Sequence, residues 1–266
     1  MKKALTILAV MAIAASILCF AGCGAKEDNV LDMATNAAFP PYEYKDGDAI
    51  VGIDAEVAAK IAEKLGMELK IHDVEFGSIV GGVQTGKFDM GMAGMTVTEE
   101  RLQSVNFTDT YAKGIQAVIV KGDSSYKSYE EFYTGFDANG NPSGVKDGIK
   151  IGVQQDTTGD IYASDVAAKW GFEEKNVVRY KDGPTAVNAL KEGKVTAVII
   201  DNEPAKSFVA ANTDLKILEG AYTEEEYAIC VAKDNEELIT KINTALKELI
   251  ADGTVAAIVE KYIPSK

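Results

Sequence analysis

The sequence predicts an α/β fold divided into two similar lobes. Segments with strand-like and helix-like patterns alternate along the chain, which is typical of a sheet covered by helices on both faces. A weak internal repeat supports two lobes: residues 83–89 and 190–196 each place a Gly-Lys pair between a helical pattern and a buried strand. The length of 266 residues suits one large domain or two. Two unrelated helix-to-strand turns would give the same repeat, and this alternative stays open.

The first lobe begins with a short strand at 31–34. A helix follows from Ile53, because the apolar residues from there to position 65 recur at helical spacing and Gly66 is suited to end it. Residues 69–74 alternate as a strand, and His72 falls on its polar phase, so we expect a solvated side chain. A helix at 78–85 and an apolar strand at 88–93 complete this part.

The second half of the chain continues the alternation. Residues 149–153 predict a strand that leads into a helix, and the apolar run 197–200 predicts a buried strand that ends at Asp201. Cys230 lies in another apolar strand pattern, which favours a buried, unreactive thiol. The apolar stripe from 238 to 249 predicts a C-terminal helix.

The order of these elements predicts two crossings between the lobes. A β-rich stretch that starts near residue 117 leads out of the first lobe, and the chain returns near 223. Lobe one then comprises 29–116 plus 223–266, and lobe two comprises 117–222. We expect each lobe to hold a mixed, mostly parallel sheet flanked by helices, with the two crossings acting as a hinge.

The first residues predict an export signal. Met1-Lys2-Lys3 precedes an uncharged apolar stretch at 4–20, and small residues follow, which is the pattern of a secretory signal peptide at 1–22. The segment Phe20-Ala21-Gly22-Cys23 resembles a bacterial lipobox, although Phe20 stands where Leu is usual. We therefore expect a lipid on Cys23, a short tether at 23–28 and an extracytoplasmic protein anchored to the cell membrane. A plain signal peptide or an N-terminal membrane anchor is the alternative.

Composition and charge disfavour several classes of function. The net charge of −14 argues against nucleic-acid binding, which needs a basic surface. The single histidine disfavours His-rich metal sites and His-dependent nucleophilic catalysis. No phosphate-binding glycine loop is present. In the polar segment 133–148, Asp and Asn residues alternate as in calcium loops, but Pro142 and Gly148 occupy the positions that need Gly and Glu, which favours a surface hairpin. We expect neither a cofactor nor a metal.

Three predicted strand ends carry polar groups that suit a ligand, since open α/β sheets bind ligands there. Thr96 and Glu99 match a capping box, so Thr96 predicts a helix start, and Arg101 can grip a carboxylate. Thr157 or Thr158 can cap a second helix. Asp201 can accept hydrogen bonds from an ammonium group. Each of these residues can instead be an ordinary cap or surface charge. A zwitterion between the lobes would satisfy both Arg101 and Asp201.

The chain resembles the family 3 solute-binding proteins of ABC-type polar amino acid importers, of the glutamine- and histidine-binding type. The resemblance covers nearly all of the mature chain and rests on segments 36–42, 51–56, 94–101 and 106–111. The Gly-x-Asp-x-Glu start of the first helix and the Thr-x-Glu-Arg run are specific in combination. The resemblance implies a two-lobed periplasmic-binding-protein-like fold that closes about its ligand by a hinge motion.

The resemblance also implies roles for the charged ends of the ligand. Arg101 would hold the α-carboxylate of a free amino acid, with help from Thr96 and the backbone of Thr158. Asp201 and the Gly94 carbonyl would hold the α-ammonium group. These assignments raise Arg101 and Asp201 above their alternatives as surface charge and helix cap.

Further positions would surround the ligand side chain. Phe39 and Phe76 would flank it, Asn36 would contact its tip, and Gln154 and Asp156 would lie at the opposing wall. Members of the family that bind cationic side chains often carry Asp where this chain has Asn36. The departure favours a neutral polar ligand such as glutamine, although Asp156 can still pair with a cation.

The resemblance implies an ABC permease as partner and a monomer that contacts the membrane through its lipid alone. An enzyme remains the alternative, because some similar folds host a dehydratase of the cyclohexadienyl type. Such an enzyme needs a general acid in the cleft, and Asp156 is the only evident candidate. A sensor domain is a third reading, but the sequence shows no kinase or channel segment.

Overall fold

The computed structural model describes residues 29–164, 171–220 and 223–264. The predicted signal peptide, Cys23 and the tether lie outside these residues. The following description concerns the unit Leu31–Lys266. None of its described helices combines the length and the apolar character that a membrane crossing requires.

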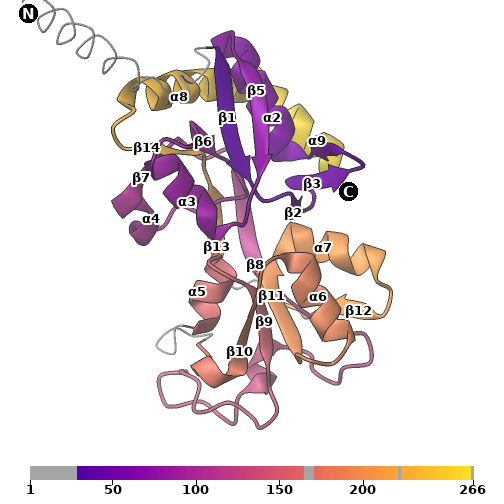
Figure 1. Cartoon of the computed structure of the whole chain (residues 1–266). Helices are drawn as coiled ribbons and strands as arrows, with labels where there is room; N and C mark the ends of the chain where they lie inside the picture. Colours follow the sequence, from indigo (N-terminus) through magenta and orange to yellow (C-terminus); the bar gives the residue numbers. More distant parts are fainter. Residues whose placement is uncertain (1–28, 165–170, 221–222, 265–266) are drawn as a thin grey trace, which may run out of the picture. The chain divides into compact units, whose positions relative to one another are not determined.

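Lobe one is built on a five-stranded sheet with the strand order β5-β1-β6-β14-β7 (Figure 1). β1 pairs with β6 in parallel, whereas β14 is antiparallel to both β6 and β7, so the sheet is mixed. The strands are β1 (Val30–Thr35), β5 (Glu68–Asp73), β6 (Met90–Gly91), β7 (Val105–Phe107) and β14 (Cys230–Ala232). The helices are α2 (Ile53–Leu65), α3 (Gly77–Gln84), α4 (Glu99–Ser104), α8 (Glu236–Ala251) and α9 (Thr254–Tyr262).

Lobe two is built on a second mixed sheet with the order β10-β9-β11-β8-β12. β9 is parallel to β10 and β11, and β8 is antiparallel to β11 and β12. The strands are β8 (Ala112–Lys121), β9 (Ile151–Gln154), β10 (Val177–Tyr180), β11 (Ala197–Asp201) and β12 (Leu215–Ile217). The helices are α5 (Thr158–Ser164), α6 (Gly183–Lys191) and α7 (Asn202–Ala211), with 3₁₀ turns η1 (Tyr129–Phe132) and η2 (Glu174–Asn176).

The two sheets confirm the internal repeat. β6 and β11 hold the same central position in their sheets, and each follows a helix that ends at a Gly-Lys pair. Gly86 and Gly193 both have the left-handed backbone that glycine tolerates, with φ of 71° and 74°. Their amides donate to Val83 and Leu190 in the same way. The repeat therefore reflects a shared supersecondary unit.

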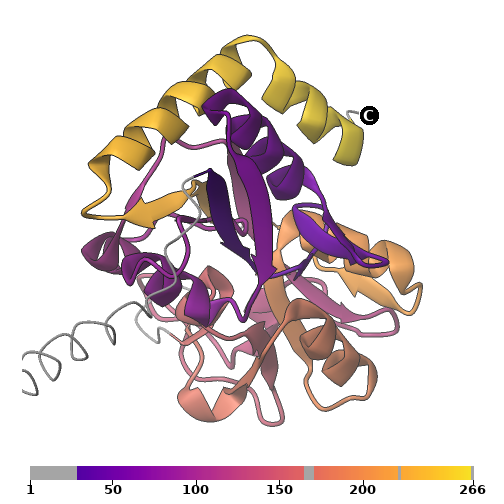
Figure 2. The same ribbon diagram turned by 45° about the horizontal axis from the view of Figure 1, so that its top comes forward.

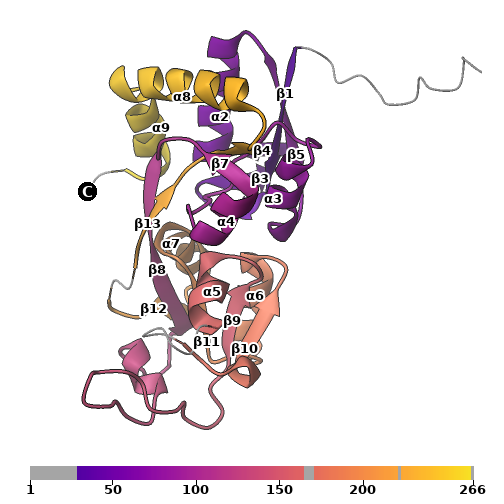
Figure 3. The same cartoon turned by 90° about the vertical axis from the view of Figure 1, so that its left-hand side faces the viewer.

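Two antiparallel strands connect the lobes. β8 is longer than the predicted strand, and its first half pairs with β13 (Glu224–Tyr227) in a register from Ile115 opposite Glu224 to Ala112 opposite Tyr227. Figures 1 and 3 both show β8 and β13 side by side between the two sheets. The crossings are thus a hydrogen-bonded ribbon, and the exact lobe boundaries near residues 117 and 223 remain a prediction.

The helices α2 and α8 of lobe one form where apolar residues recur at helical spacing, as predicted. Ile53, Val57 and Ile61 are fully buried on one face of α2, and Gly66 ends the helix with a left-handed backbone. α2 packs against α8 and α9, which lie together at the top of Figure 2. The C-terminal stripe supplies the buried face of α8.

A small third sheet was not predicted. It joins β2 (Ala38–Phe39), β3 (Glu43–Asp46) and β4 (Ala49–Val51) in the order β2-β3-β4. Strands this short carry too few residues to show alternation, so periodicity could not reveal them. β4 leads through Gly52 into α2.

Other details differ from expectation. Of the strand predicted at 88–93, only β6 (Met90–Gly91) forms, and the residues on either side of it are bends or irregular backbone. His72 is half-buried, and its Nε2 lies at hydrogen-bond distance, 2.6 Å, from Asp32 Oδ1. The prediction of a solvated histidine did not include this contact. The 133–148 segment contains the antiparallel bridges Tyr133–Val145 and Phe136–Pro142, which fits the predicted hairpin.

Candidate functional site

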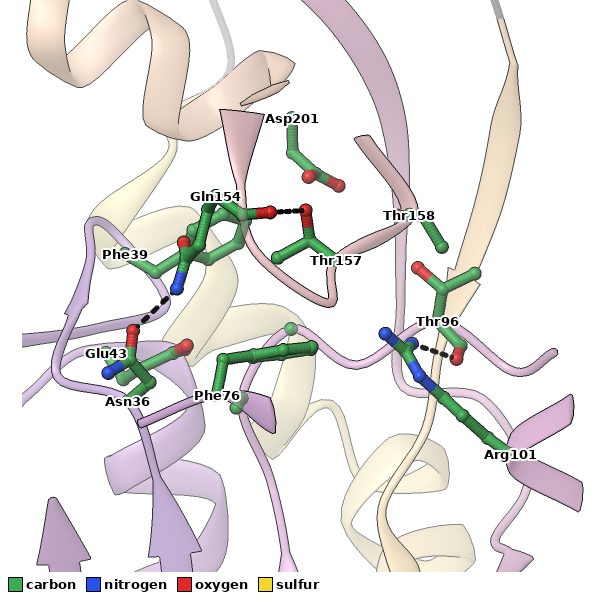
Figure 4. A pocket seen from close by; sticks show the side chains of 12 residues that line it. Asn36, Phe39, Glu43, Phe76, Thr96, Arg101, Gln154, Thr157, Thr158 and Asp201 are labelled. Carbon is green, nitrogen blue, oxygen red and sulfur yellow. Dashed lines mark hydrogen bonds between the residues drawn. The ribbon is translucent and has the colours of Figure 1, made fainter. Parts of the chain in front are cut away.

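A cavity lies between the two lobes. It is lined from lobe one and lobe two by Asn36, Phe39, Glu43, Phe76, Ala93, Gly94, Thr96, Arg101, Gln154, Thr157, Thr158 and Asp201. Figure 4 shows Arg101, Thr96 and Thr158 at one end of the cavity and Asn36, Glu43 and Gln154 at the other. All but one of the ten predicted ligand-binding residues therefore come together.

Asp156 is the exception. It lines a neighbouring outer groove that also contains Arg101 and Phe76. Its backbone is left-handed, with φ of 65°, an uncommon conformation for a residue other than glycine. Its carboxylate faces Gly77 at the start of α3: a Cβ built on Gly77 would stand 2.1 Å from Asp156 Oδ2. Asp156 thus contacts lobe one beside the cavity, whereas Gln154, which was predicted at the same wall, does line the cavity.

Arg101 is almost fully buried and held by both lobes. Its Nη1 donates to the Thr96 carbonyl at 2.7 Å, and its Nη2 donates to the Asp156 carbonyl at 3.1 Å. The guanidinium carbon lies 5.1 Å from the centre of the Phe76 ring, a cation–π distance. Burial lowers the pKa of Arg101, and nearby groups that include Glu225 and Asp201 oppose this effect. The planar cation is fixed where an anionic group could meet it.

Thr96 does not start a helix, which corrects the predicted capping box. α4 begins at Glu99, and Thr98 caps it by accepting a hydrogen bond from the Arg101 amide at 3.2 Å. Thr96 instead forms an antiparallel bridge with Tyr227, far away in the sequence. This tertiary contact keeps Thr96 extended and leaves it buried at the cavity wall.

Asp201 ends β11 and occupies the N-cap position of α7, but its side chain makes no capping hydrogen bond. It accepts a hydrogen bond from the Tyr227 hydroxyl instead and lines the cavity. Burial, and next the charge of Glu225, raise the pKa of Asp201 well above its usual value. A cation placed beside Asp201 would relieve this cost.

The opposite end of the cavity joins the lobes through amides. Gln154 Nε2 donates to Asn36 Oδ1 at 2.9 Å, and Asn36 Nδ2 donates to the Val74 carbonyl at 2.8 Å. Together with the bond from Arg101 to Asp156, this contact bridges the lobes on both sides of the cavity. The predicted role of Asn36 at the tip of a ligand side chain is compatible with this place.

Glu43 was missed by the sequence analysis. It lies on β3, is 1% exposed and lines the same end of the cavity. Within the described part of the chain, its Oε2 has no hydrogen-bond partner. Burial, and next the neighbouring Asp54, raise the pKa of Glu43 well above its usual value. A signal was present, since Glu43 directly follows the 36–42 segment that carried the family resemblance.

Asp54, from the Gly-x-Asp-x-Glu start of α2, supports the cavity from behind. Its Oδ2 accepts hydrogen bonds from the Gly94 amide at 2.8 Å and the Tyr111 hydroxyl at 2.9 Å. Burial raises the pKa of Asp54 to about 6. These bonds fix the left-handed turn at Gly94, whose φ is 51°. A Cβ at Gly94 would lie 2.8 Å from Phe39, so glycine keeps the wall close-packed.

Thr157 was named as a possible cap but not as a cavity residue. It donates to the Gln154 carbonyl at 2.8 Å, and its hydroxyl accepts from the Asp160 amide at 3.4 Å, so Thr157 caps α5. Thr158 follows as the first helical residue and also lines the cavity. The early amides of α5 can therefore donate to an anion.

The chemistry of this site suits binding of a zwitterion. A buried guanidinium lies toward one end, a carboxyl group faces the interior, and polar side chains with two aromatic rings surround the rest. Among residues 29–164, 171–220 and 223–264, no group of three His, Cys, Asp or Glu side chains could hold a metal ion.

Comparison with known proteins identifies the family. The model of the family described as bacterial extracellular solute-binding proteins, family 3, matches residues 31–265. The arginine-binding extracellular protein ArtP of Bacillus subtilis is 30% identical over 234 residues, which cover 87% of this chain and 85% of that protein. The L-cystine-binding protein TcyJ of Escherichia coli is 26% identical over 241 residues, 89% of this chain and 84% of its relative.

Solved structures show the same architecture. The P235GK mutant of ArgBP from T. maritima superposes with a TM-score of 0.78 at 35% identity, covering 89% of this chain and 96% of the other. An ancestral arginine-binding protein bound to glutamine gives 0.77 at 36% identity, covering 90% and 100%. These matches confirm the predicted two-lobed periplasmic-binding-protein fold, and they are binding proteins rather than enzymes. This chain therefore belongs to the family 3 bacterial extracellular solute-binding proteins, as one of its amino acid-binding members.

Proposed function

We propose that the protein captures a free L-amino acid with a polar side chain by closing its lobes about it, and that it delivers the ligand to an ABC permease. The α-carboxylate binds Arg101, with Thr96 and the start of α5 at Thr158 beside it. The α-ammonium group binds Asp201 and the Gly94 carbonyl. The ligand side chain extends between Phe39 and Phe76.

The observation that carries this proposal is that Arg101 and Asp201 line the same cavity. Both side chains are more than nine-tenths buried, one is a guanidinium and the other a carboxyl group, and they come from different lobes. Burying either charge is costly unless a partner neutralises it. A zwitterion supplies both partners at once and holds the two lobes together.

Two side-chain classes fit the far end of the cavity. Asn36 and Gln154 are neutral amides, which favours a neutral polar side chain such as that of glutamine. Arginine is the second candidate, because Glu43 places a buried carboxyl oxygen without a hydrogen-bond partner among the described residues at this end. Proteins similar to this chain are named for arginine, and one ancestral structure holds glutamine.

A thermal-shift screen of the purified protein against the proteinogenic amino acids tests the proposal. A ligand at 100 times its Kd should stabilise the protein by about 2.7 kcal/mol. We expect one or a few polar amino acids to raise the melting temperature, and Arg101→Ala or Asp201→Ala to remove the shift. The absence of a shift with every amino acid would refute the proposal.

The variant Glu43→Gln separates the two ligand classes. If arginine is the ligand, removing the carboxyl group should weaken binding strongly, because a buried guanidinium then loses its anionic partner. If glutamine is the ligand, the amide at position 43 can still donate or accept a hydrogen bond, and the affinity should change little. Calorimetry of both amino acids with wild type and variant measures the difference.

The place of action follows from the N-terminal sequence. We propose that residues 1–22 are removed, that Cys23 is lipidated and that the protein acts as a monomer tethered outside the cytoplasm. The support is the charge, apolarity and small residues of that segment together with the extracellular family to which the chain belongs.

A further inference from the structure

The start of α7 leaves the Asp201 carboxyl group available to a partner other than its own helix. An N-cap side chain accepts a hydrogen bond from the amide of the second or third residue of the helix. The third residue of α7 is Pro204, which has no amide hydrogen, so Glu203 is the only usual donor that remains. Within the described residues 171–220, Asp201 makes no capping hydrogen bond with its side chain.

The partner that Asp201 takes instead is Tyr227, on the crossing strand β13. The Tyr227 hydroxyl donates a hydrogen bond to Asp201 Oδ2. Tyr227 is 0% exposed and Asp201 5%, so the bond forms away from water, where a hydrogen bond to a carboxyl group is strong. A carboxyl group held at one oxygen keeps a fixed direction, and this one lines the cavity.

The hydroxyl of Tyr227 is itself held in place by its surroundings. The ring packs edge-on against Tyr42, with centroids 5.1 Å apart and an angle of 83° between the planes. On β8, a Cβ built on Gly114 would stand 2.1 Å from the hydroxyl oxygen of Tyr227, so glycine at this position makes room for the phenol. The Tyr227 side chain therefore brings a rigid donor to Asp201.

The bond joins residues that the two sheets hold separately. The backbone of Tyr227 is bound to lobe one, because it forms the bridge with Thr96 and its carbonyl accepts from the Tyr111 amide at 2.9 Å. Asp201 ends β11 in the sheet of lobe two. The direction of the Asp201 carboxyl group thus depends on how the lobes are arranged.

Electrostatics favours the same role. Burial, and next the charge of Glu225, raise the pKa of Asp201, and the hydrogen bond from Tyr227 opposes both. A donor at Asp201 Oδ2 stabilises the ionised carboxylate, which is the form that pairs with an ammonium group.

We propose that Tyr227 is a positioning residue for the ligand: its hydroxyl holds the Asp201 carboxyl group toward the cavity, so that the α-ammonium group of an amino acid meets an oriented carboxylate. Tyr227 stands outside the set of described residues that line the cavity, and it acts through Asp201. The inference rests on the proposed binding of an amino acid.

Tyr227→Phe tests the inference, because it removes the hydroxyl and keeps the ring against Tyr42. In calorimetry, the affinity for L-glutamine or L-arginine, whichever the wild type binds, should fall about 10- to 100-fold, the loss of a buried hydrogen bond to a charged group. The matching ligand without the α-amino group, 4-carbamoylbutanoate or 5-guanidinopentanoate, should keep its affinity, measured by competition with the amino acid.

Tyr42→Phe is the matched control. It removes a buried hydroxyl from the same aromatic pair, but that hydroxyl lies 3.5 Å from the Lys113 carbonyl oxygen and is not bonded to Asp201. The affinity for the amino acid should therefore equal that of the wild type.

Each outcome decides for or against the inference. Unchanged affinity of Tyr227→Phe for the amino acid would overturn it, and so would an equal loss for the amino acid and its analogue, which would indicate a general packing effect. Both results leave the proposed function intact, whereas no binding of any amino acid by the wild type would overturn both proposals.

A structure of the wild-type protein with the bound amino acid decides if Tyr227→Phe does not fold or if the analogues bind too weakly to measure. The inference requires the Tyr227 hydroxyl and the ligand ammonium group on the same Asp201 carboxyl group. A bound ligand whose ammonium group lies away from Asp201, or an Asp201 without Tyr227, would overturn it.

Discussion

Adding one methyl group at Gly77 should weaken ligand binding without weakening the fold. Gly77 starts α3 in lobe one, and Asp156 approaches it from lobe two. A Cβ at this position would meet Asp156 Oδ2 at 2.1 Å, Cγ at 3.0 Å and Cβ at 3.3 Å, which are its three nearest neighbouring atoms. The clash therefore opposes the contact between the lobes rather than either lobe itself.

The size of the effect follows from this overlap. The backbone of Asp156 is held in place, because its carbonyl accepts from Arg101 and its φ is left-handed, so its exposed side chain must rotate away from the new methyl group. Relieving an overpacked contact costs about 1–3 kcal/mol. If ligands bind in the conformation in which the lobes touch, this cost is taken from the binding energy, so Kd should rise by roughly 5- to 150-fold.

Gly81 provides a matched control. It lies on the same helix, and a Cβ there would meet nothing within 4 Å. Gly81→Ala should stabilise the ligand-free protein by about 0.5–1 kcal/mol and leave Kd unchanged, because alanine is the better helix former. Calorimetry measures Kd, and urea unfolding without ligand should show Gly77→Ala to be as stable as wild type.

A second substitution identifies the cause. Asp156→Gly removes the carboxylate that clashes and suits the left-handed backbone. The double variant Gly77→Ala/Asp156→Gly should regain the affinity of Asp156→Gly alone. Equal affinities of Gly77→Ala and Gly81→Ala would refute the reasoning, since the lobe contact would then be absent from the bound state.

Three further predictions concern other parts of the chain. Gly52→Ala should destabilise the protein by about 3 kcal/mol or more in urea unfolding, because the φ of Gly52 is 125° and a Cβ would stand 2.2 Å from the Tyr42 carbonyl oxygen. Gly66→Ala is the control: a Cβ at Gly66 has no neighbouring atom within 4 Å, so the substitution should cost only about 1 kcal/mol. Cys230 is fully buried, and burial raises the pKa of its thiol to about 12, so thiol reagents at pH 8 should modify it only after unfolding, and rapid labelling of the folded protein would contradict this. Cys23→Ser should move the protein from the membrane fraction to the medium or periplasm, whereas unchanged membrane association would exclude the lipid anchor.

The sequence pattern predicted correctly those elements whose start, apolar face and end depend on neighbouring residues. The helix from Ile53 to Leu65 ends at Gly66 because an apolar face and a left-handed cap are both written in adjacent residues. Arg101 and Asp201 could be paired because strand ends of an α/β fold meet at one edge of each sheet. These two residues do line one cavity.

The differences have tertiary causes. Thr96 and Thr98 each precede a possible first turn, and only the bridge from Thr96 to Tyr227 decides between them. Glu43 lies in a strand of four residues, so its burial beside Asp54 depends on tertiary packing that no local pattern encodes. Asp156 does not line the cavity, because its backbone is left-handed and its side chain faces Gly77.

The return of the chain into lobe one sets an order for biosynthesis. The strands β8 to β12 of lobe two form one continuous stretch, so all of them are present once Ile217 has left the ribosome or the export channel, and only β13 is still to pair with β8. The sheet of lobe one must wait for Cys230–Ala232, which inserts as β14 between β6 and β7. The half that begins the polypeptide is thus finished last, and its open strand edges are those that a chaperone would need to cover during secretion.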